Sequence, residues 1–336
     1  MKNLKFFFLG TLLCSGMLLF NACVFDDDDS EELVGNWVRK SDYEGVTRSE
    51  GVAFVIGDLA FAGLGYDGDD DLLDFWQYDP ALDFWTRVDT FPGIARRGAV
   101  AFSANGKGYV GTGYSGDLDE ELNDFWEFDP NAAPGEQWRR VADFLGSARY
   151  NAVAFGLNDK GYVGTGYDGN WLKDFYEYDP GTDEWIQIVS LGGSKREDAV
   201  AFVIGDRAYV ATGRNNGIYE MDFWEFDGTN KTWTPRLDID DDDDYTVARH
   251  TAVGFSLNGY GYVATGSTGT STRTIWQYDP TSDLWEQKTS LEGSARTGAV
   301  GFTVSGRSFL TTGSSGGTRL DDLWEFRPDE ELDEDD

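Results

Sequence analysis

The sequence is organised by a seven-residue motif that recurs six times along most of its length. The clearest copy, DFWEFDP, occupies residues 124–130. The copies begin at residues 74, 124, 174, 222, 274 and 322, so their spacing is 50, 50, 48, 52 and 48 residues. A period near 50 is typical of repeat architectures, in which one supersecondary unit is copied several times. Every other motif must therefore be interpreted within this repeat.

Each repeat contains four predicted β-strands, which we call a, b, c and d. In the second repeat, strand a covers residues 96–102 and strand b covers residues 108–113. The Asn105-Gly106 turn between them is a strong hairpin signal. The motif itself forms strand c, which Asp129-Pro130 ends. Strand d follows around Trp138.

The count of strands predicts how the chain closes on itself. Six a, b and c strands are present, but only five d strands follow them. The missing d strand is expected at residues 35–40, where Trp37 takes the repeated Trp position. This strand should pair with residues 322–326, because closure of a ring leaves only short, protected edges. The sequence thus predicts an all-β, six-bladed β-propeller over residues 35–328.

The repeats resemble those of the kelch family. The shared features are an Arg before strand a, a Gly at the end of strand b, an aromatic strand c before Asp-Pro, and a Trp in strand d. The resemblance covers about residues 36–328. One departure is that the family's double glycine appears as Leu64-Gly65 in the first repeat and as Thr-Gly in the others. The resemblance implies the propeller fold, and it leaves function open because kelch propellers include enzymes and binding modules.

The N-terminus predicts export and lipid attachment. Lys2 and Lys5 precede an apolar run at residues 6–20, and Ala22-Cys23 resembles the cleavage box of a bacterial lipoprotein. We expect a signal peptide at residues 1–22, and a lipidated Cys23 with an acidic tether at residues 23–34. Residues 329–336 form an acidic tail. These features favour an outer-membrane lipoprotein, whereas an ordinary signal peptide with an incidental cysteine is the alternative.

Composition excludes several classes of function. The formal net charge is −34, which argues against nucleic acid as a partner. Both cysteines lie within the first 23 residues, so the repeats contain no disulfide and no thiolate metal site. The acidic runs at residues 67–71 and 240–244 could bind Ca²⁺ weakly, but neither has EF-hand spacing, and solvated loops are favoured. We expect no cofactor.

Strand direction alternates within a blade, which sorts the connections onto two faces. The b–c and d–a loops share one face, called face X, and the a–b and c–d turns share the opposite face Y. The loops of face X are longer and more varied, and such loops are where binding usually occurs. One Arg precedes strand a in every blade on face X and is a candidate to bind an anionic ligand at the channel mouth: Arg48, Arg96, Arg149, Arg196, Arg249 and Arg296.

A structural role for these arginines is the favoured alternative. Six unpaired guanidinium groups around one mouth would repel one another. The first Asp of each motif also begins at face X, within reach of a long Arg side chain, so Arg–Asp pairing is expected. The fifth blade has Thr274 in place of this Asp, so Arg249 or Arg296 could lack its partner there.

Further binding candidates follow strand b. The residues directly after the strand b glycine include Tyr66, Tyr114, Tyr167 and Arg214, which give one side of the mouth distinct chemistry. Trp171 lies in the third b–c loop and is the only one of 12 Trp outside the repeated c and d positions. The other eleven are expected to be buried between and within blades.

Three functions are compatible with these patterns. We favour a lipid-anchored, non-enzymatic module that binds an envelope protein or a glycan at face X. The alternative is a sugar epimerase or mutarotase of the kelch type, with Glu197 or His250 as acid or base. A purely structural envelope component is the third possibility. The resemblance also implies that copper oxidase chemistry is excluded, because the chain has one histidine and no cysteine in the repeats.

Overall fold

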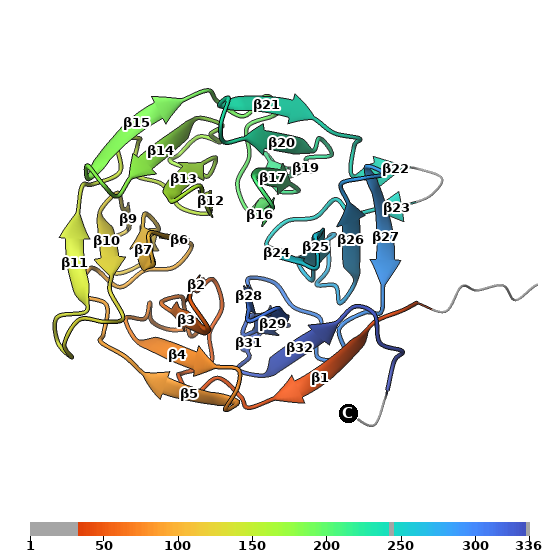
Figure 1. Ribbon diagram of the computed structural model, residues 1–336, viewed down its shortest axis with the longest axis horizontal. Coiled ribbons are helices and arrows are strands. Elements are labelled where there is room, and N and C mark those ends of the chain that lie inside the picture. Colours follow the sequence, from red (N-terminus) through yellow and green to blue (C-terminus); the bar gives the residue numbers. More distant parts are fainter. Residues whose placement is uncertain (1–32, 242–244, 334–336) are drawn as a thin grey trace, which may run out of the picture. The chain divides into compact units, whose positions relative to one another are not determined.

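The computed structural model describes residues 33–241 and 245–333. This part of the chain forms six four-stranded antiparallel sheets arranged as blades around one centre (Figure 1), so the predicted six-bladed propeller is confirmed. Within it, no helix has the length and apolarity to cross a membrane. The predicted signal peptide and Cys23 lie outside the described residues.

Each blade places its four strands in the order a, b, c, d from the centre outward. Blade 1 comprises β2 (Val52–Ile56), β3 (Leu59–Gly63), β4 (Phe75–Asp79) and β5 (Phe84–Arg87). Blade 2 comprises β6 (Val100–Ala104), β7 (Lys107–Gly111), β10 (Phe125–Phe128) and β11 (Trp138–Val141). Blade 3 comprises β12 (Val153–Leu157), β13 (Lys160–Gly164), β14 (Phe175–Asp179) and β15 (Glu184–Ile188).

The remaining blades repeat this order, and the last one takes a strand from the N-terminus. Blade 4 comprises β16 (Val200–Ile204), β17 (Arg207–Ala211), β20 (Trp224–Asp227) and β21 (Thr232–Pro235). Blade 5 comprises β24 (Val253–Leu257), β25 (Tyr260–Ala264), β26 (Ile275–Asp279) and β27 (Leu284–Lys288). Blade 6 comprises β28 (Val300–Val304), β29 (Arg307–Thr311), β32 (Leu323–Arg327) and β1 (Asn36–Lys40).

The N-terminal strand closes the ring as the sequence predicted. β1 pairs antiparallel with β32, and Trp37 lies opposite Phe326. The two rings are 4.7 Å apart, and the Trp37 indole N–H donates a 3.1 Å hydrogen bond to the carbonyl of Thr289. Trp37 is fully buried. The first and last segments of the propeller are therefore fastened by both backbone pairing and aromatic packing.

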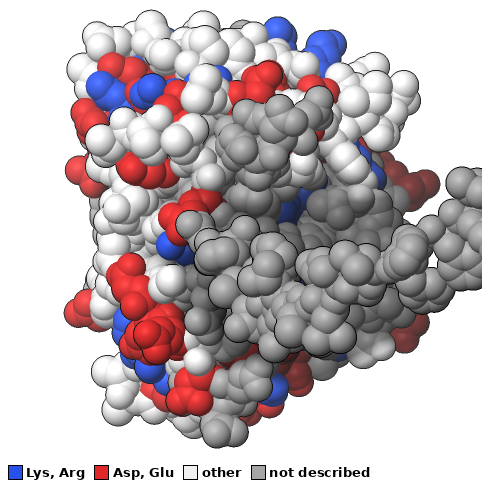
Figure 2. All heavy atoms as spheres, turned by 90° about the vertical axis from the view of Figure 1, so that its right-hand side faces the viewer, with Lys and Arg blue, Asp and Glu red and all other residues white. Residues whose placement is uncertain are grey.

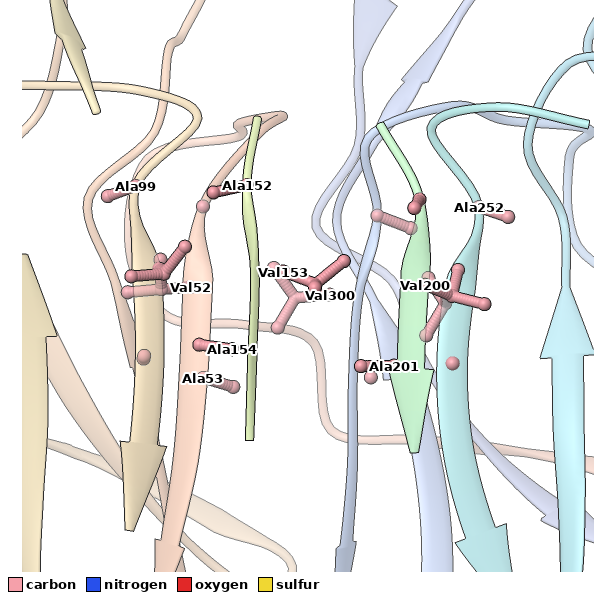
Figure 3. Close-up of a pocket in the computed structure, with 18 residues that line it drawn as sticks. Val52, Ala53, Ala99, Ala152, Val153, Ala154, Val200, Ala201, Ala252 and Val300 are labelled. Carbon is pink, nitrogen blue, oxygen red and sulfur yellow. The ribbon is translucent and has the colours of Figure 1, made fainter. Parts of the chain in front are cut away.

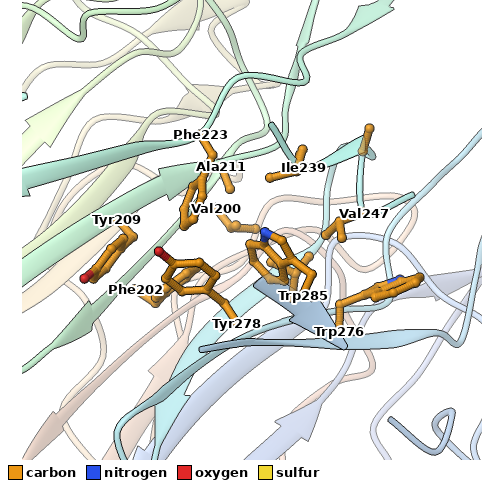
Figure 4. Close-up of a cluster of buried hydrophobic side chains, with 12 residues drawn as sticks. Val200, Phe202, Tyr209, Ala211, Phe223, Ile239, Val247, Trp276, Tyr278 and Trp285 are labelled. Atoms are coloured by element: carbon orange, nitrogen blue, oxygen red, sulfur yellow. The ribbon is translucent and has the colours of Figure 1, made fainter. Parts of the chain in front are cut away.

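The cores lie between adjacent blades. Figure 4 shows the cluster between blades 4 and 5, in which Phe202 and Phe223 of one blade contact Tyr278 and Trp285 of the next. Because both faces of a blade are covered, its strands are apolar on both sides. The repeated Trp residues are buried or half-buried here, which supports their structural interpretation.

Glycine at the start of strand b permits the close approach of neighbouring blades. A Cβ atom on Gly161 would lie 2.0 Å from the ring of Phe102 in the preceding blade. Gly108 and Gly261 meet Phe54 and Phe202 in the same way, at 2.1 Å. The repeated glycine is therefore required by packing between blades.

The b–c loops of face X alternate between two forms. Blades 2, 4 and 6 carry short hairpins, whereas blades 1, 3 and 5 carry tight bends. The hairpins are β8 (Tyr114–Ser115) with β9 (Glu120–Glu121), β18 (Arg214–Asn215) with β19 (Ile218–Tyr219), and β30 (Ser314–Ser315) with β31 (Thr318–Arg319). A further hairpin, β22 (Asp240–Asp241) with β23 (Tyr245–Thr246), precedes blade 5.

Candidate functional site at the channel mouth

A closed ring of backbone hydrogen bonds surrounds the channel on face X. In each blade, the residue two positions after the repeated Arg donates its N–H to the carbonyl of its counterpart in the preceding blade, at 2.8–3.2 Å. All six residues have φ between 50° and 59°. We call this ring the collar; it consists of Glu50, Gly98, Asn151, Asp198, Thr251 and Gly298.

A second ring of hydrogen bonds lies around the collar. The glycine after each strand b donates its N–H to the carbonyl of the repeated Arg in the next blade, at 2.7–2.9 Å. Gly313 of blade 6 donates to Arg48 of blade 1, so this ring is also closed. These two closed rings of backbone hydrogen bonds hold the six blades in register at face X. They therefore fix the backbone positions that carry the side chains at the mouth.

The side chains of the six repeated arginines lie inside the blades and do not line the mouth. Each is between 0% and 1% exposed. In blade 2, Arg96 donates to both carboxylate oxygens of Asp124, at 2.7 and 2.9 Å, and Trp126 donates to the same carboxylate at 2.7 Å. The guanidinium also donates to the carbonyl oxygens of Ile94 and Thr112. It is thus held by protein acceptors on every side.

The same arrangement recurs in four other blades, so the expected Arg–Asp pairing is confirmed. The pairs are Arg48–Asp74, Arg96–Asp124, Arg149–Asp174, Arg196–Asp222 and Arg296–Asp322. The expectation of an arginine ring facing a ligand is corrected: only the backbone of each Arg reaches the ring, and its side chain runs outward to strand c. In blade 5, Arg249 is equally buried but meets Thr274.

Six pairs of residues form the rim directly above the collar. In each pair, the residue after the repeated Arg exchanges two backbone hydrogen bonds of 2.8–3.1 Å with the residue after the strand b glycine. The rim pairs are Ser49–Tyr66, Arg97–Tyr114, Tyr150–Tyr167, Glu197–Arg214, His250–Ser267 and Thr297–Ser314. Neighbouring pairs differ strongly in chemistry, which gives the mouth distinct sides.

Blades 1 to 3 supply an aromatic side. The Arg97 guanidinium lies between the rings of Tyr66 and Tyr114, 4.6 and 5.1 Å from their centroids, and it donates to Asp71 at 2.9 Å. From Tyr114 the rings continue through Tyr150, Tyr167 and Trp171, with successive centroids 5.6, 5.7 and 5.3 Å apart. We call Tyr66, Tyr114, Tyr150, Tyr167 and Trp171 the aromatic arc. All five are half-buried and so keep solvent-facing surface.

Blades 4 and 5 supply an acidic side next to the end of the arc. Glu197 accepts a 3.3 Å hydrogen bond from Trp171 Nε1 and lies 3.4 Å from Arg214 Nε. Arg214 Nη2 also contacts Asp198 at 3.2 Å. The same Asp198 oxygen lies 3.6 Å from Nδ1 of His250. We call Glu197, Asp198, Arg214 and His250 the acidic cluster.

Environment shifts two titratable groups at the mouth. Burial raises the pKa of Glu50; the charge of Arg97 opposes this shift and that of Asp198 adds to it. Burial and the charge of Glu197 raise the pKa of the Tyr150 hydroxyl to about 12. Tyr150 is therefore a neutral hydrogen-bond donor at physiological pH, and the carboxylates of the mouth can accept hydrogen bonds from a hydroxyl-rich ligand.

Below the collar, small side chains line the channel. The mouth encloses a cavity of about 140 Å³. It is lined by the collar residues and, in each blade, by the residue that follows the collar residue and directly precedes the innermost strand. Next comes a cavity of about 180 Å³, in which Ala and Val side chains from all six blades surround the axis (Figure 3). These side chains supply no acid or base; the next cavity along the axis, of about 340 Å³, adds the hydroxyl groups of Ser103, Ser256 and Thr303.

The acidic bend of blade 1 has internal partners. Asp67 accepts hydrogen bonds from the backbone N–H groups of Asp69 and Asp70, both at 2.8 Å, and Asp71 binds Arg97. In the described ranges, no three His, Cys, Asp or Glu side chains are arranged to hold a metal ion. Weak Ca²⁺ binding at the acidic runs stays a prediction. On the side seen in Figure 2, acidic and basic side chains are interspersed.

The structure brings most of the other predicted candidates to one place. Tyr66, Tyr114, Tyr167 and Arg214 belong to the rim, Trp171 extends it, and Glu197 and His250 belong to the acidic cluster.

Sequence reasoning missed several members of this site. Asp198, Glu50 and Asn151 lie on the collar, and Tyr150 and Arg97 lie on the rim. The sequence did contain a signal that could have identified them, because all five residues lie one or two positions after the repeated Arg.

Comparison with known proteins supports the fold alone. The sequence matches no protein-family model and no curated protein. Among solved structures, the structure of YjhT is similar, with a TM-score of 0.71, 17% sequence identity, and coverage of 84% of this chain and 96% of that chain. At this identity the similarity establishes a common architecture. The chemistry of the mouth must be argued from its own residues.

Proposed function

We propose that this protein is a lipid-anchored binding module of the bacterial envelope that recognises a glycan at the mouth of face X. The observation that carries the proposal is the aromatic arc, which ends directly on the acidic cluster at the hydrogen bond between Trp171 and Glu197. Below the rim, the collar lines a cavity of about 140 Å³ to which Asp198 of the acidic cluster contributes.

Carbohydrates combine two features that the mouth complements. Their C–H faces pack against aromatic rings, and their hydroxyl edges donate hydrogen bonds to carboxylates. The arc supplies the rings, and Glu197 and Glu50 supply acceptors beside it. The collar fixes all of these groups on backbone that is already hydrogen-bonded, so little ordering is required on binding.

The envelope location rests on the sequence. The apolar segment followed by Ala22-Cys23 and the acidic run of residues 26–32 support a lipidated, tethered protein. The repeat pattern supports assignment of the propeller to the kelch type. A glycan-binding face on such a tether would sample surrounding polysaccharide or glycoprotein.

A glycan-binding screen on residues 30–336 tests the proposal. We expect capture of one class of glycan, with affinity reduced about tenfold by Trp171→Ala or Tyr167→Ala, because each variant removes a packing ring. The matched control is Tyr260→Ala, which removes an exposed tyrosine at the start of strand b of blade 5, beside the a–b turn of face Y. Equal binding by all four proteins would contradict the proposed site.

Metabolic lipid labelling tests the anchor separately. We expect the label in the wild-type protein and none in Cys23→Ser, because Cys23 is the residue that follows the cleavage site. Persistent labelling of the variant would refute lipid attachment at this cysteine, whatever the outcome of the glycan screen.

The acidic cluster favours a second candidate function, a sugar epimerase or mutarotase. Glu197 and Asp198 are 7% and 8% exposed, and Nδ1 of His250 lies 3.6 Å from an Asp198 oxygen. In mutarotation, a base takes the proton of the anomeric hydroxyl while an acid protonates the ring oxygen. The C–O bond of the ring then breaks, and reclosure on the other face returns both protons. Glu197 and His250 would fill these two roles.

Anomer exchange followed by NMR distinguishes the two candidates. For an enzyme, we expect saturation transfer between the α and β anomers to be accelerated by the wild-type protein and not by Glu197→Gln. The control Glu184→Gln alters an exposed carboxylate of the outermost strand of blade 3. A module that only binds would show glycan capture without accelerated exchange in any variant.

A further inference from the structure

Blade 5 contains a buried arginine that lacks the counter-charge found in every other blade. Arg249 is 1% exposed, as deeply buried as its five counterparts. The other five donate to an aspartate carboxylate, whereas the strand c position in blade 5 is Thr274. Among the side chains that the structure describes, those of residues 33–240 and 246–333, no carboxylate lies within 4 Å of the Arg249 guanidinium.

The hydrogen bonds of Arg249 show which part of the usual partner is absent. Its Nε donates to the carbonyl of Val247 at 2.8 Å. Its Nη1 donates to the carbonyls of Thr265 and Thr274 and to Thr274 Oγ1, at 3.0, 3.2 and 3.1 Å. Thr274 thus replaces one carboxylate oxygen. Within the described ranges no acceptor bonds to Nη2, the group that meets the second carboxylate oxygen in blades 1, 2, 3 and 6.

Neighbouring hydroxyl groups are engaged elsewhere. Thr246 Oγ1 donates to Asp240 at 2.6 Å. Thr272 Oγ1 accepts from the backbone N–H of Thr274 at 3.2 Å and is hydrogen-bonded to its hydroxyl at 3.0 Å. The described protein therefore satisfies neither the charge nor the Nη2 donor of Arg249. A water molecule could accept the hydrogen bond, but it would leave a buried positive charge uncompensated.

We propose that Arg249 binds a small monoatomic anion of the halide class, at the position where other blades place the second carboxylate oxygen. Because Thr274 already supplies one acceptor, only one more is needed, and a single atom provides it together with the missing charge. Burial lowers the pKa of Arg249 to about 10, which is the expected response of a cation without a partner.

The site has a direct connection to the mouth. The carbonyl of Arg249 accepts the N–H of Gly213 in the ring around the collar, at 2.8 Å. The next residue is His250 of the acidic cluster. An anion that holds the Arg249 side chain therefore secures the backbone on which this histidine stands, whether or not the mouth binds a glycan.

Thermal unfolding of the full-length protein at constant ionic strength tests the proposal. We expect the Tm to be higher in sodium chloride or bromide than in sodium gluconate by about 2 °C or more, because gluconate is too large to enter. In Thr274→Asp, the carboxylate replaces the anion. This variant should be more stable than the wild type in gluconate and should show no halide dependence.

The matched control is Thr268→Asp, which adds the same charge at an exposed position of the same b–c loop, where blades 1 and 3 carry Asp67 and Asp168. It should keep the halide dependence of the wild type. Bromide-soaked crystals of the wild-type protein give a direct measurement that does not depend on the variants folding. An anomalous peak within hydrogen-bond distance of Arg249 Nη2 is expected.

Three results would overturn the proposal. One is a wild-type Tm that is equal in halide and gluconate. Another is a halide dependence that survives in Thr274→Asp, and the third is a bromide map without an anomalous peak beside Arg249.

Discussion

Substitution of Asp124 by Asn isolates the charge of one buried Arg–Asp pair. The Arg96 side chain is fully buried and that of Asp124 is 14% exposed. The carboxylate accepts two hydrogen bonds from Arg96 and one from Trp126. Asn keeps the shape but removes the negative charge and turns one acceptor into a donor that faces the guanidinium.

The expected cost follows from that geometry. Removal of one partner from a buried ion pair costs about 3–5 kcal/mol, because the remaining charge is uncompensated. Asp124 retains some solvent contact, which places the expected loss of unfolding free energy near 3 kcal/mol. For a domain of about 300 residues, whose unfolding entropy is about 0.6 kcal/mol/K, that loss corresponds to a fall in Tm of roughly 5 °C.

Urea unfolding followed by tryptophan fluorescence measures this loss. The control is Asp143→Asn, which removes the same charge from an exposed pair in the same blade, where Arg140 and Asp143 side chains are 57% and 46% exposed. That change should stay within about 0.5 kcal/mol. Equal effects of the two substitutions would refute the structural role of the buried pair. Loss of glycan capture without loss of stability would restore the arginine ring as a ligand site.

Three further predictions follow from the packing and the charges. Trp37→Ala should lower the urea midpoint strongly and expose blade 6 to amide exchange first, because it removes the ring that packs on the closing strand; exchange spread evenly over all blades would contradict this. Gly161→Ala should destabilise the fold by roughly 3 kcal/mol, because its Cβ would meet Phe102 at 2.0 Å. The control Gly181→Ala should cost far less in the same unfolding measurement, because its Cβ would meet only the Asp179 carboxylate, at 3.2 Å. The five Arg-paired aspartates are affected by burial, which raises their pKa, but their arginines outweigh it and hold each pKa below its usual value. The stability that these ion pairs contribute is therefore fully present above the pKa of Asp in the unfolded chain, about 3.9. It is lost as the pH falls through the lower pKa values of the folded state. A Tm that stays constant from about pH 5 down to pH 2 would contradict this prediction.

Residues that recur every 50 positions determined the fold from the sequence alone. The aromatic strand c, the Asp-Pro that ends it and the strand d Trp predicted six blades, and Trp37 predicted the closing strand. The prediction from sequence succeeds because each blade packs with the same residues at the same positions, so the same pattern appears in all six repeats. The Arg–Asp pairing was predictable for the same reason.

The site follows less directly from the repeat. Tyr66, Tyr114 and Tyr167 do recur at one position, after the strand b glycine, but most of the other members do not. The six side chains after the repeated arginines are all different, and no local pattern joins Glu197 to His250. They come together only because ring closure and the collar place positions about 50 residues apart side by side, across the boundary of two blades. The repeat specified the frame, while its curvature in three dimensions decided which side chains meet at the mouth: the arginine side chains run outward to strand c, and their neighbours face the mouth.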